Sequence, residues 1–272
     1  MSPRPDAKVA KGAGAVLAAL AWAYVGAREA GGLEVVHHRV TVPGLPSPVR
    51  LLHLSDLHLG APPGRRERRL VEVANSLEAD LICLTGDLVS STEAIPGCGQ
   101  LLARLEARVG KFAVTGNNEY ENPVDLDAWR AMLAQAGFAY LENQAMAPLP
   151  GLALLGLDDP LRGHPKPAEA FAQAPEDHFR VWLAHSPHIA AQLEQYGQGL
   201  LLAGHTHGGQ FCLPGGWPPV LRTPFWRRKH ASGFSRKGPL LVYVSRGYGY
   251  SLLPVRYFCR PEITLLELAP RA

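Results

Sequence analysis

The segment G-H-T-H-G-G-Q at residues 204–210 constrains this chain more than any other feature of its sequence. It places His205 and His207 one residue apart between glycines, directly after the apolar run Gly199–Ala203. Side chains at alternate positions of extended backbone share a face, so we expect both imidazoles to point the same way. The flanking glycines allow the backbone to approach a ligand closely. Taken alone, the loop is also compatible with a satisfied polar cluster.

Four more apolar runs end in carboxylate, amide or imidazole side chains, and each is a candidate strand. They cover residues 49–54, 81–84, 111–114 and 179–184. In open α/β sheets, ligand sites form at the carboxyl ends of the strands. The side chains that follow the five runs are therefore our candidate metal ligands: Asp56, His58, Asp87, Asn117, His185, His205 and His207.

The donor atoms of this set indicate the kind of metal. Oxygen and imidazole ligands without cysteine suit Mn, Fe, Zn or Co rather than a thiolate-held structural zinc. The set is too large for one ion that keeps open positions, and it fits two ions that share a bridging carboxylate. We therefore expect two divalent cations, with Mn favoured.

In their order, these motifs resemble the calcineurin-like metallophosphoesterase superfamily, which reads D-x-H, G-D, G-N-H-D/E, a lone H, and G-H-x-H. The similarity spans about Leu51 to Gln210. Residues 242–249, 254–256 and 260–263 are also similar to the membrane-linked bacterial subgroup close to the YkuE-type proteins. The resemblance implies an α/β fold, a four-layer αββα sandwich in which helices flank two mixed β-sheets.

The resemblance also implies how the ligands divide. One ion would be bound by Asp56, His58 and His207, the other by Asn117, His185 and His205, and Asp87 would bridge the two. Two such cations can clamp the phosphoryl oxygens of an in-line displacement and lower the pKa of bound water. We therefore expect metal-assisted hydrolysis of a phosphoester or phosphoanhydride.

One position departs from the family pattern, because Asn118 stands where the family has histidine. With His185, it is our candidate catalytic position. The family's histidine is a plausible general acid, but an amide cannot deliver a proton at pH 7. Loss of general-acid help costs about 10²–10⁴-fold for a poor leaving group. The substitution favours a diphosphate substrate, as in the UDP-diacylglucosamine hydrolases of lipid A synthesis, which also lack this histidine. A weakened or inactive site is the alternative.

The N-terminal segment differs from the rest in composition. Basic residues precede an uncharged stretch at residues 12–27, which as a helix spans about 24 Å, less than the ~30 Å hydrocarbon core. Three interpretations stay open: a tilted membrane anchor, a secretory signal with a small-residue cleavage pattern at residues 25–27, or a helix packed on the domain. We assign residues 1–32 to this leader and residues 33–272 to one catalytic domain.

Composition and periodicity bound the remainder. A hydrophobic content of 47% with 19% charged residues is typical of a globular protein, and a net charge of +3 is too small to indicate nucleic-acid binding. The cysteines form no CxxC pair, and we infer no disulfide framework. Periodicity predicts helices at 65–77, 100–108, 125–136 and 188–196. It predicts further strands at 33–42, an edge strand, and at 152–157, 180–184, 200–203, 240–244 and 263–268.

Two loops are candidates for holding substrate, residues 60–66 and 211–230. The cations that they offer are Arg65, Arg66, Arg222, Arg227 and Arg228. The second loop mixes these with aromatic residues, which suits a membrane interface or the stacking of a nucleobase with a clamped phosphate. A solvated surface loop is the alternative.

These features predict a dimetal phosphohydrolase associated with the bacterial inner membrane on either side, or a secreted or periplasmic form. The narrower hypothesis is a lipid pyrophosphatase of the UDP-2,3-diacylglucosamine type. Its rivals are a broad phosphodiesterase or phosphatase on soluble esters and a metal-binding homologue without turnover. The expected partners are a phosphorylated small-molecule or lipid-linked substrate and a membrane surface, but no nucleic acid.

Overall fold

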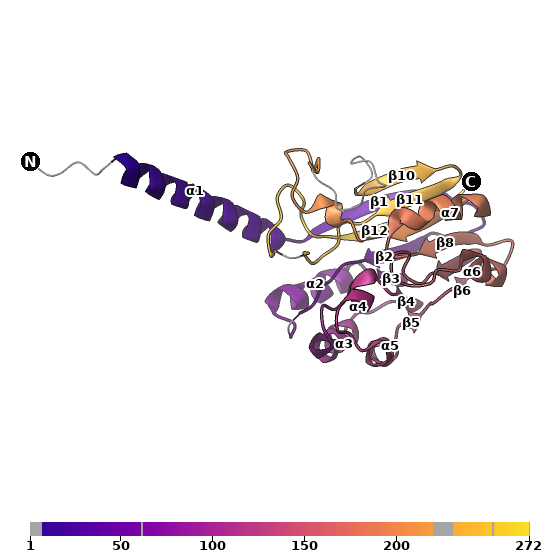
Figure 1. Ribbon diagram of the computed structural model, residues 1–272. Helices are drawn as coiled ribbons and strands as arrows, with labels where there is room; N and C mark the ends of the chain where they lie inside the picture. Colours follow the sequence, from indigo (N-terminus) through magenta and orange to yellow (C-terminus); the bar gives the residue numbers. More distant parts are fainter. Residues whose placement is uncertain (1–6, 61, 220–230, 252, 272) are drawn as a thin grey trace, which may run out of the picture.

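The computed structural model describes residues 7–60, 62–219, 231–251 and 253–271 (Figure 1), with the side chains of the first helix described from residue 19. Its strands form two six-stranded sheets. The first has the order β1 (Glu34–Val42), β12 (Glu262–Pro270), β2 (Val49–Leu54), β3 (Leu81–Thr85), β4 (Gly110–Val114) and β5 (Ala139–Tyr140). In it β2, β3, β4 and β5 run parallel, and β12 is antiparallel to β2.

The second sheet also has parallel central strands, and it carries one antiparallel strand at each edge. Its order is β10 (Gly233–Lys237), β11 (Leu240–Val244), β9 (Gly199–Ala203), β8 (Phe179–Leu183), β7 (Leu152–Gly156) and β6 (Gln144–Leu149). The strands from β11 to β7 are parallel, and β10 and β6 pair antiparallel at the two edges. The carboxyl ends of the central parallel strands carry the predicted ligands.

Strand alternation builds three apolar layers. In β9, Leu200 and Leu202 enter the core between the sheets, whereas Leu201 packs on the outer side with Trp182. Helices α2 (Arg65–Ser76), α3 (Ile95–Leu102) and α5 (Leu126–Gln135) supply the outer core of the first sheet, and α6 (Pro167–Gln173) and α7 (Ala190–Leu193) supply that of the second. The predicted αββα sandwich and the edge position of β1 are confirmed.

Two predicted helices are wrong in detail. The helix expected at residues 100–108 is α3, which begins at Ile95 and ends at Leu102, because Pro96 occupies the first turn, where its missing N–H costs nothing. The helix expected at 188–196 is three short pieces, of which only α7 is α-helical. The sequence prediction also missed α4 (Asn117–Glu121), β6 and β10, which are short or lie at an edge.

The N-terminal helix α1 (Ala7–Ala30) projects away from the sandwich (Figure 1). Its last turns contact the loop before β12, where the Tyr257 hydroxyl donates to the Trp22 carbonyl at 2.8 Å and the two rings lie 5.4 Å apart. The Glu29 carboxylate accepts a hydrogen bond from the Cys259 N–H. Among the described residues, no helix has both the length and the apolar character needed to cross a bilayer.

His53 gives the fold a testable pH dependence. It is fully buried in β2 beside the Thr85 hydroxyl, as expected for a strand residue outside the metal site, and burial lowers its pKa to about 3. The unfolded chain takes up this proton below pH 6.5, so the stability from neutral His53 is present above that pH and is lost as the pH falls toward 3. Within this window His53 contributes a slope of up to about 1.4 kcal/mol per pH unit. In urea titrations across it, His53→Leu should flatten the slope relative to wild type, and equal slopes would contradict the assignment.

Candidate metal centre

The predicted ligands lie on loops that leave the strands abruptly. Asp56, His58, Asp87, His205 and His207 all have positive φ, between 47° and 69°. Such left-handed backbone costs about 1–3 kcal/mol at a non-glycine residue and persists where the surroundings enforce it, often at functional sites. The expectation that strand alternation directs the histidine pair to one face is therefore wrong, since the backbone there is not extended.

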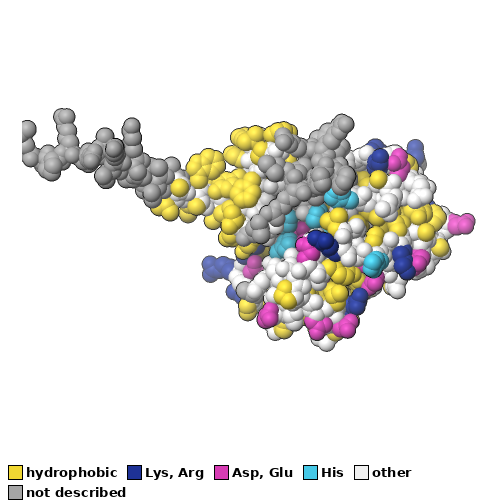
Figure 2. All heavy atoms as spheres, viewed as in Figure 1, with side chains coloured by type: hydrophobic (Ala, Val, Ile, Leu, Met, Phe, Trp, Pro, Cys, Tyr) yellow, Lys and Arg dark blue, Asp and Glu magenta, His cyan; other side chains and the backbone are white. Residues whose placement is uncertain are grey.

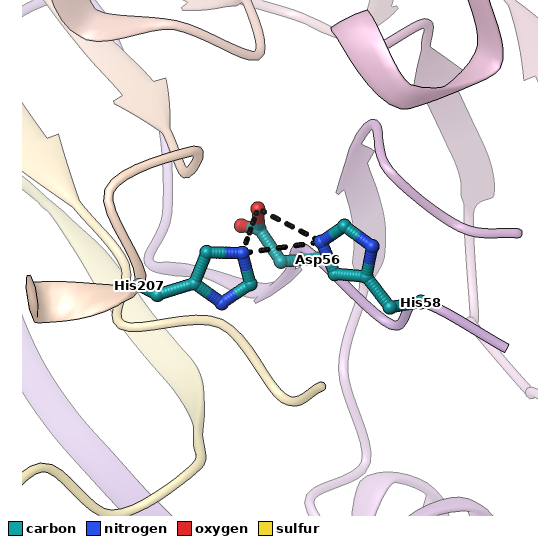
Figure 3. A group of neighbouring side chains, drawn as sticks. All are labelled: Asp56, His58 and His207. Carbon is teal, nitrogen blue, oxygen red and sulfur yellow. Dashed lines mark hydrogen bonds and ion pairs between the residues drawn. The ribbon is translucent and has the colours of Figure 1, made fainter. Parts of the chain in front are cut away.

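The first cluster joins the loops after β2 and β9 (Figure 3). His58 Nε2 and His207 Nε2 are 3.1 Å apart, and Asp56 Oδ1 lies 3.9 Å from the former and 3.4 Å from the latter. All three side chains direct their potential ligand atoms toward one point (Figure 3). Gly204 is required here, because a Cβ at that position would lie 2.2 Å from Asp56 Oδ2.

The second cluster centres on Asp87. Its Oδ2 lies 3.4 Å from His58 Nε2 and 3.3 Å from His185 Nε2, so it stands between the two histidines. His205 follows on the far side, with Nδ1 3.2 Å from His185 Nε2. Asp56 also lies close enough to share a cation with Asp87 and His185, so the structure has two candidate shared carboxylates, whereas the sequence motifs predicted only Asp87.

Asn117 tests whether a cation fits this donor set. Its Oδ1 is buried and has no hydrogen-bond partner among the described residues. A buried carbonyl oxygen left without a donor costs about 1–3 kcal/mol, and a cation would remove that cost. The set offers oxygen and imidazole nitrogen atoms and no thiolate, in keeping with a divalent cation of the Mn, Fe, Zn or Co group.

Neighbouring charges and burial shift the pKa values of two histidines in the cluster in opposite directions. Burial disfavours charged His185, but the Asp87 carboxylate outweighs it, and the pKa of His185 lies well above its ordinary value. Burial, reinforced by His58 and Arg256, lowers the pKa of His207 well below its ordinary value and keeps that imidazole neutral. A neutral imidazole is the form that binds metals.

Two buried charged residues that the sequence prediction missed hold these loops in place. The Glu119 carboxylate accepts hydrogen bonds from the backbone N–H groups of Asp87, Leu88 and Gly116, and so ties the loop after β3 to the loop after β4. Arg256 is fully buried, and its guanidinium donates to backbone carbonyls at 246, 247, 249 and 259 and to that of His207. Glu119 could have been identified as the last residue of its motif, whereas nothing in the sequence indicated that Arg256 is buried.

Asn118 lies at the cluster, where its backbone N–H donates to Asp87 Oδ1 at 2.8 Å. Its carboxamide is already engaged, because it donates to the Val89 carbonyl and accepts from the Asn122 side chain. The Asn118 side chain, which stands where the family has histidine, is thus held in place by hydrogen bonds with Val89 and Asn122.

Of the five arginines predicted to bind substrate, two lie within the described residues. The Arg66 guanidinium stacks 3.9 Å above the Tyr248 ring and donates to the Tyr248 carbonyl, and it is only partly exposed. Arg65 is exposed at the start of α2. The others, Arg222, Arg227 and Arg228, lie outside the described residues.

Comparison with known proteins agrees with this geometry. The sequence model of the family described as calcineurin-like phosphoesterase matches residues 49–209. The chain is 28% identical to the uncharacterized metallophosphoesterase YkuE of Bacillus subtilis, over 94% of this chain and 92% of the relative. It is 31% identical to the phosphodiesterase YaeI of Escherichia coli, over 88% and 90% respectively. It is 32% identical to a transmembrane protein with a metallophosphoesterase domain from Danio rerio, over 86% of this chain but only 57% of the relative.

Proposed function

The chain belongs to the calcineurin-like phosphoesterase family of metal-dependent hydrolases, and from this premise we propose that its strand-end cluster binds two divalent cations and cleaves a phosphoester or diphosphate bond. The observation that carries the proposal is the position of Asp87 Oδ2, within 3.4 Å of an imidazole nitrogen on either side. A carboxylate that lies between imidazoles of two ligand sets suits a pair of cations rather than one.

The proposed division of ligands follows the two clusters. Asp56, His58 and His207 would hold one cation and Asn117, His185 and His205 the other, with Asp87 placed between the two sets. Bound there, two cations would supply a nucleophile from water near neutral pH and would stabilise charge on the transferred phosphoryl group.

The protein's own groups orient this donor set. The backbone N–H of His205 donates to both oxygens of Asp56 at 3.1 Å and so fixes that carboxylate. The Thr85 carbonyl lies 2.7 Å from His185 Nδ1 and sets the tautomer that leaves Nε2 free to bind a metal. No proton comes from Asn118, so the leaving group departs as an anion.

A stable anionic leaving group narrows the proposed substrate. We propose a diphosphate, and within that class a nucleotide-linked lipid of the UDP-2,3-diacylglucosamine type, because a departing phosphate needs no general acid. A broad phosphodiesterase or phosphatase on soluble esters is the second candidate, favoured by the similarity to a protein named as a phosphodiesterase.

The direct test compares the two candidates in one preparation. Protein loaded with Mn²⁺ is given a UDP-linked glycolipid or bis(p-nitrophenyl) phosphate, with Asp87→Asn protein as the blank. Release of UMP with slow diester cleavage supports the lipid pyrophosphatase. Diester cleavage with an inert glycolipid supports the broad phosphodiesterase, and hydrolysis of neither substrate would exclude the enzymatic proposal.

Asn118→His should restore general-acid help. We expect cleavage of alkyl phosphodiesters, which have poor leaving groups, to rise by about 10²-fold, the low end of the range for such catalysis, while diphosphate cleavage changes little. The measurement is kcat/KM on both substrate classes. Asn122→His, one helical turn away, is the matched control and should give no gain. An equal gain on both substrates would show that proton donation is not the missing element.

We further propose that this end of the molecule contacts a membrane surface. Ten of the fourteen exposed large hydrophobic side chains in the described residues belong to an apolar rim, consisting of Leu20, Trp22, Tyr24, Val25, Phe211, Leu213, Trp217, Tyr250, Leu253 and Phe258. Figure 2 shows hydrophobic side chains gathered on the described end of α1 and the loops beside it. Residues 19–28, 211–219 and 253–260 contain no acidic side chain, whereas Arg28 and Arg260 are exposed, which favours anionic lipid. The proposed location is the bacterial inner membrane.

Co-sedimentation with lipid vesicles tests the rim. The full chain should bind vesicles that contain anionic lipid, and Trp22→Ser combined with Leu253→Ser should weaken binding by at least about tenfold, since burying each side chain contributes about 1.5–3 kcal/mol. Val109→Ser combined with Leu161→Ser removes two exposed apolar side chains outside the rim and should leave binding unchanged. Equal binding by the two double variants would refute the proposed surface.

A further inference from the structure

Two cysteines that lie far apart in the sequence meet behind the metal-binding loop. Cys212 and Cys259 are both buried, and the Cys212 N–H donates to the Tyr257 carbonyl, which brings the two segments side by side. Both thiols are free, and their sulfur atoms contact the carbonyls of the adjacent residues Gly208 and His207. The other cysteines, Cys83 and Cys98, belong to different cores on opposite faces of the first sheet.

Both thiols also contact the backbone of the loop that carries His207. Cys259 Sγ donates to the His207 carbonyl at 3.1 Å, and Cys212 Sγ donates to the Gly208 carbonyl at 3.2 Å. A Cβ at Gly208 would lie only 2.8 Å from Cys259 Sγ, so sulfur and loop are in direct contact. The position of this candidate ligand therefore depends on two adjacent thiols.

A small molecule has a route to the pair. A cavity of about 320 Å³ lies beside the loop, and its lining includes Gly208, Phe258 and Cys259. Its volume is enough for a low-molecular-weight disulfide. Cys259 is therefore the member of the pair that borders the cavity.

We propose that Cys212 and Cys259 form a thiol–disulfide modification site, and that closing the disulfide weakens cation binding through His207. The oxidant is a low-molecular-weight disulfide, R–S–S–R. Cys259 sulfur attacks one sulfur of the reagent and releases R–SH, and Cys212 sulfur then displaces the second R–SH as the Cys212–Cys259 bond forms. Two thiols are oxidised, one reagent disulfide is reduced, and both thiol protons leave on the two R–SH products.

The closed bond changes the contacts of the loop. It removes both S–H donors from the His207 and Gly208 carbonyls and draws the segments at 212 and 259 together. Loss of contacts that orient a metal ligand typically lowers metal affinity by about 10–100-fold. The inference rests on the proposed metal site for this effect, but the disulfide itself does not.

The first measurement counts thiols in the full chain. Metal-free protein is incubated with oxidised glutathione, unfolded, alkylated and mapped by mass spectrometry. We expect a Cys212–Cys259 link with Cys83 and Cys98 still alkylated, and full recovery of four thiols with dithiothreitol. Four alkylated cysteines, or stable glutathione adducts without the link, would overturn the proposal whether or not the protein is a hydrolase.

The second measurement links the bond to the site. Mn²⁺ titrated by calorimetry should bind oxidised protein about 10–100-fold more weakly than reduced protein. The variant with both Cys212→Ser and Cys259→Ser keeps hydroxyl donors and should bind Mn²⁺ equally before and after oxidant, and Cys83→Ser should respond as wild type does. A disulfide that forms without a change in Mn²⁺ affinity would overturn the coupling. If the reduced protein binds no Mn²⁺ at all, the proposed function fails while the thiol count still decides the modification.

Discussion

Asp87→Asn should lower kcat/KM for phosphoester hydrolysis by about 10³-fold or more, which corresponds to about 4 kcal/mol of lost transition-state stabilisation. Asparagine has the same shape and keeps an oxygen that can accept from the Asn118 N–H, but it removes the negative charge that lies between His58 and His185. The same change should reduce the number of Mn²⁺ ions bound per chain in calorimetric titration. The loss therefore comes from the cations and not from the fold.

A matched control separates charge from folding. Asp125→Asn replaces an aspartate that caps α5 by accepting from the N–H groups of Asp127 and Ala128, a role that asparagine fills equally well. That variant should keep wild-type activity and stability. An Asp87→Asn protein that folds, binds two Mn²⁺ ions and retains activity within tenfold would remove Asp87 from its proposed position between the cations.

Arg256→Met should destabilise the protein by about 3–5 kcal/mol, because it leaves several buried carbonyls without a donor at a cost of about 1–3 kcal/mol each. The guanidinium is fully buried, and methionine fills part of its volume without donating to any of the carbonyls that it serves, including that of His207. The free energy of unfolding is measured by urea titration in EDTA, so that metal binding does not contribute. Arg104→Met, at an exposed position, should stay within about 0.5 kcal/mol of wild type.

The same variant should also bind Mn²⁺ less tightly at temperatures where it is folded. Arg256 donates to the carbonyls of residues 246, 247 and 249. This loop packs on Asp56, where a Cβ at Gly247 would lie 2.7 Å from that of the aspartate. A stability loss below about 1 kcal/mol would mean that water replaces the guanidinium and that the loop needs no such anchor.

The sequence predicted the parallel strands and the ends that carry the ligands because both signals are local. An apolar run that stops at glycine next to Asp, Asn or His indicates both a buried strand and the position of its carboxyl end. The sequence did not predict the left-handed backbone at Asp56 and His207, since polar residues adopt it only where tertiary contacts enforce it. Strand alternation therefore predicted which residues lie together, but it predicted the wrong backbone conformation for them.

Other errors arose where tertiary contacts override local pattern. The charged residues at 104–108 have helical spacing, but Arg108 pairs with Glu78 and Asp80 across a loop, and the glycine-containing segment before them is the helix. The burial of Arg256 and the meeting of Cys212 with Cys259 depend on segments that only the folded chain brings together.

The ligands come from both halves of the sandwich: Asp56, Asp87 and Asn117 follow strands of the first sheet, whereas His185 and His205 follow strands of the second. Cations bound there would connect the two sheets at the carboxyl ends of their strands, so they would stabilise the fold as well as take part in catalysis. By mass action, an occupied site adds about 2.7 kcal/mol to folding stability when free metal stands at one hundred times its dissociation constant. The melting temperature of this protein would then serve as a gauge of metal supply, and starvation for the metal would shorten its lifetime as well as stop its turnover.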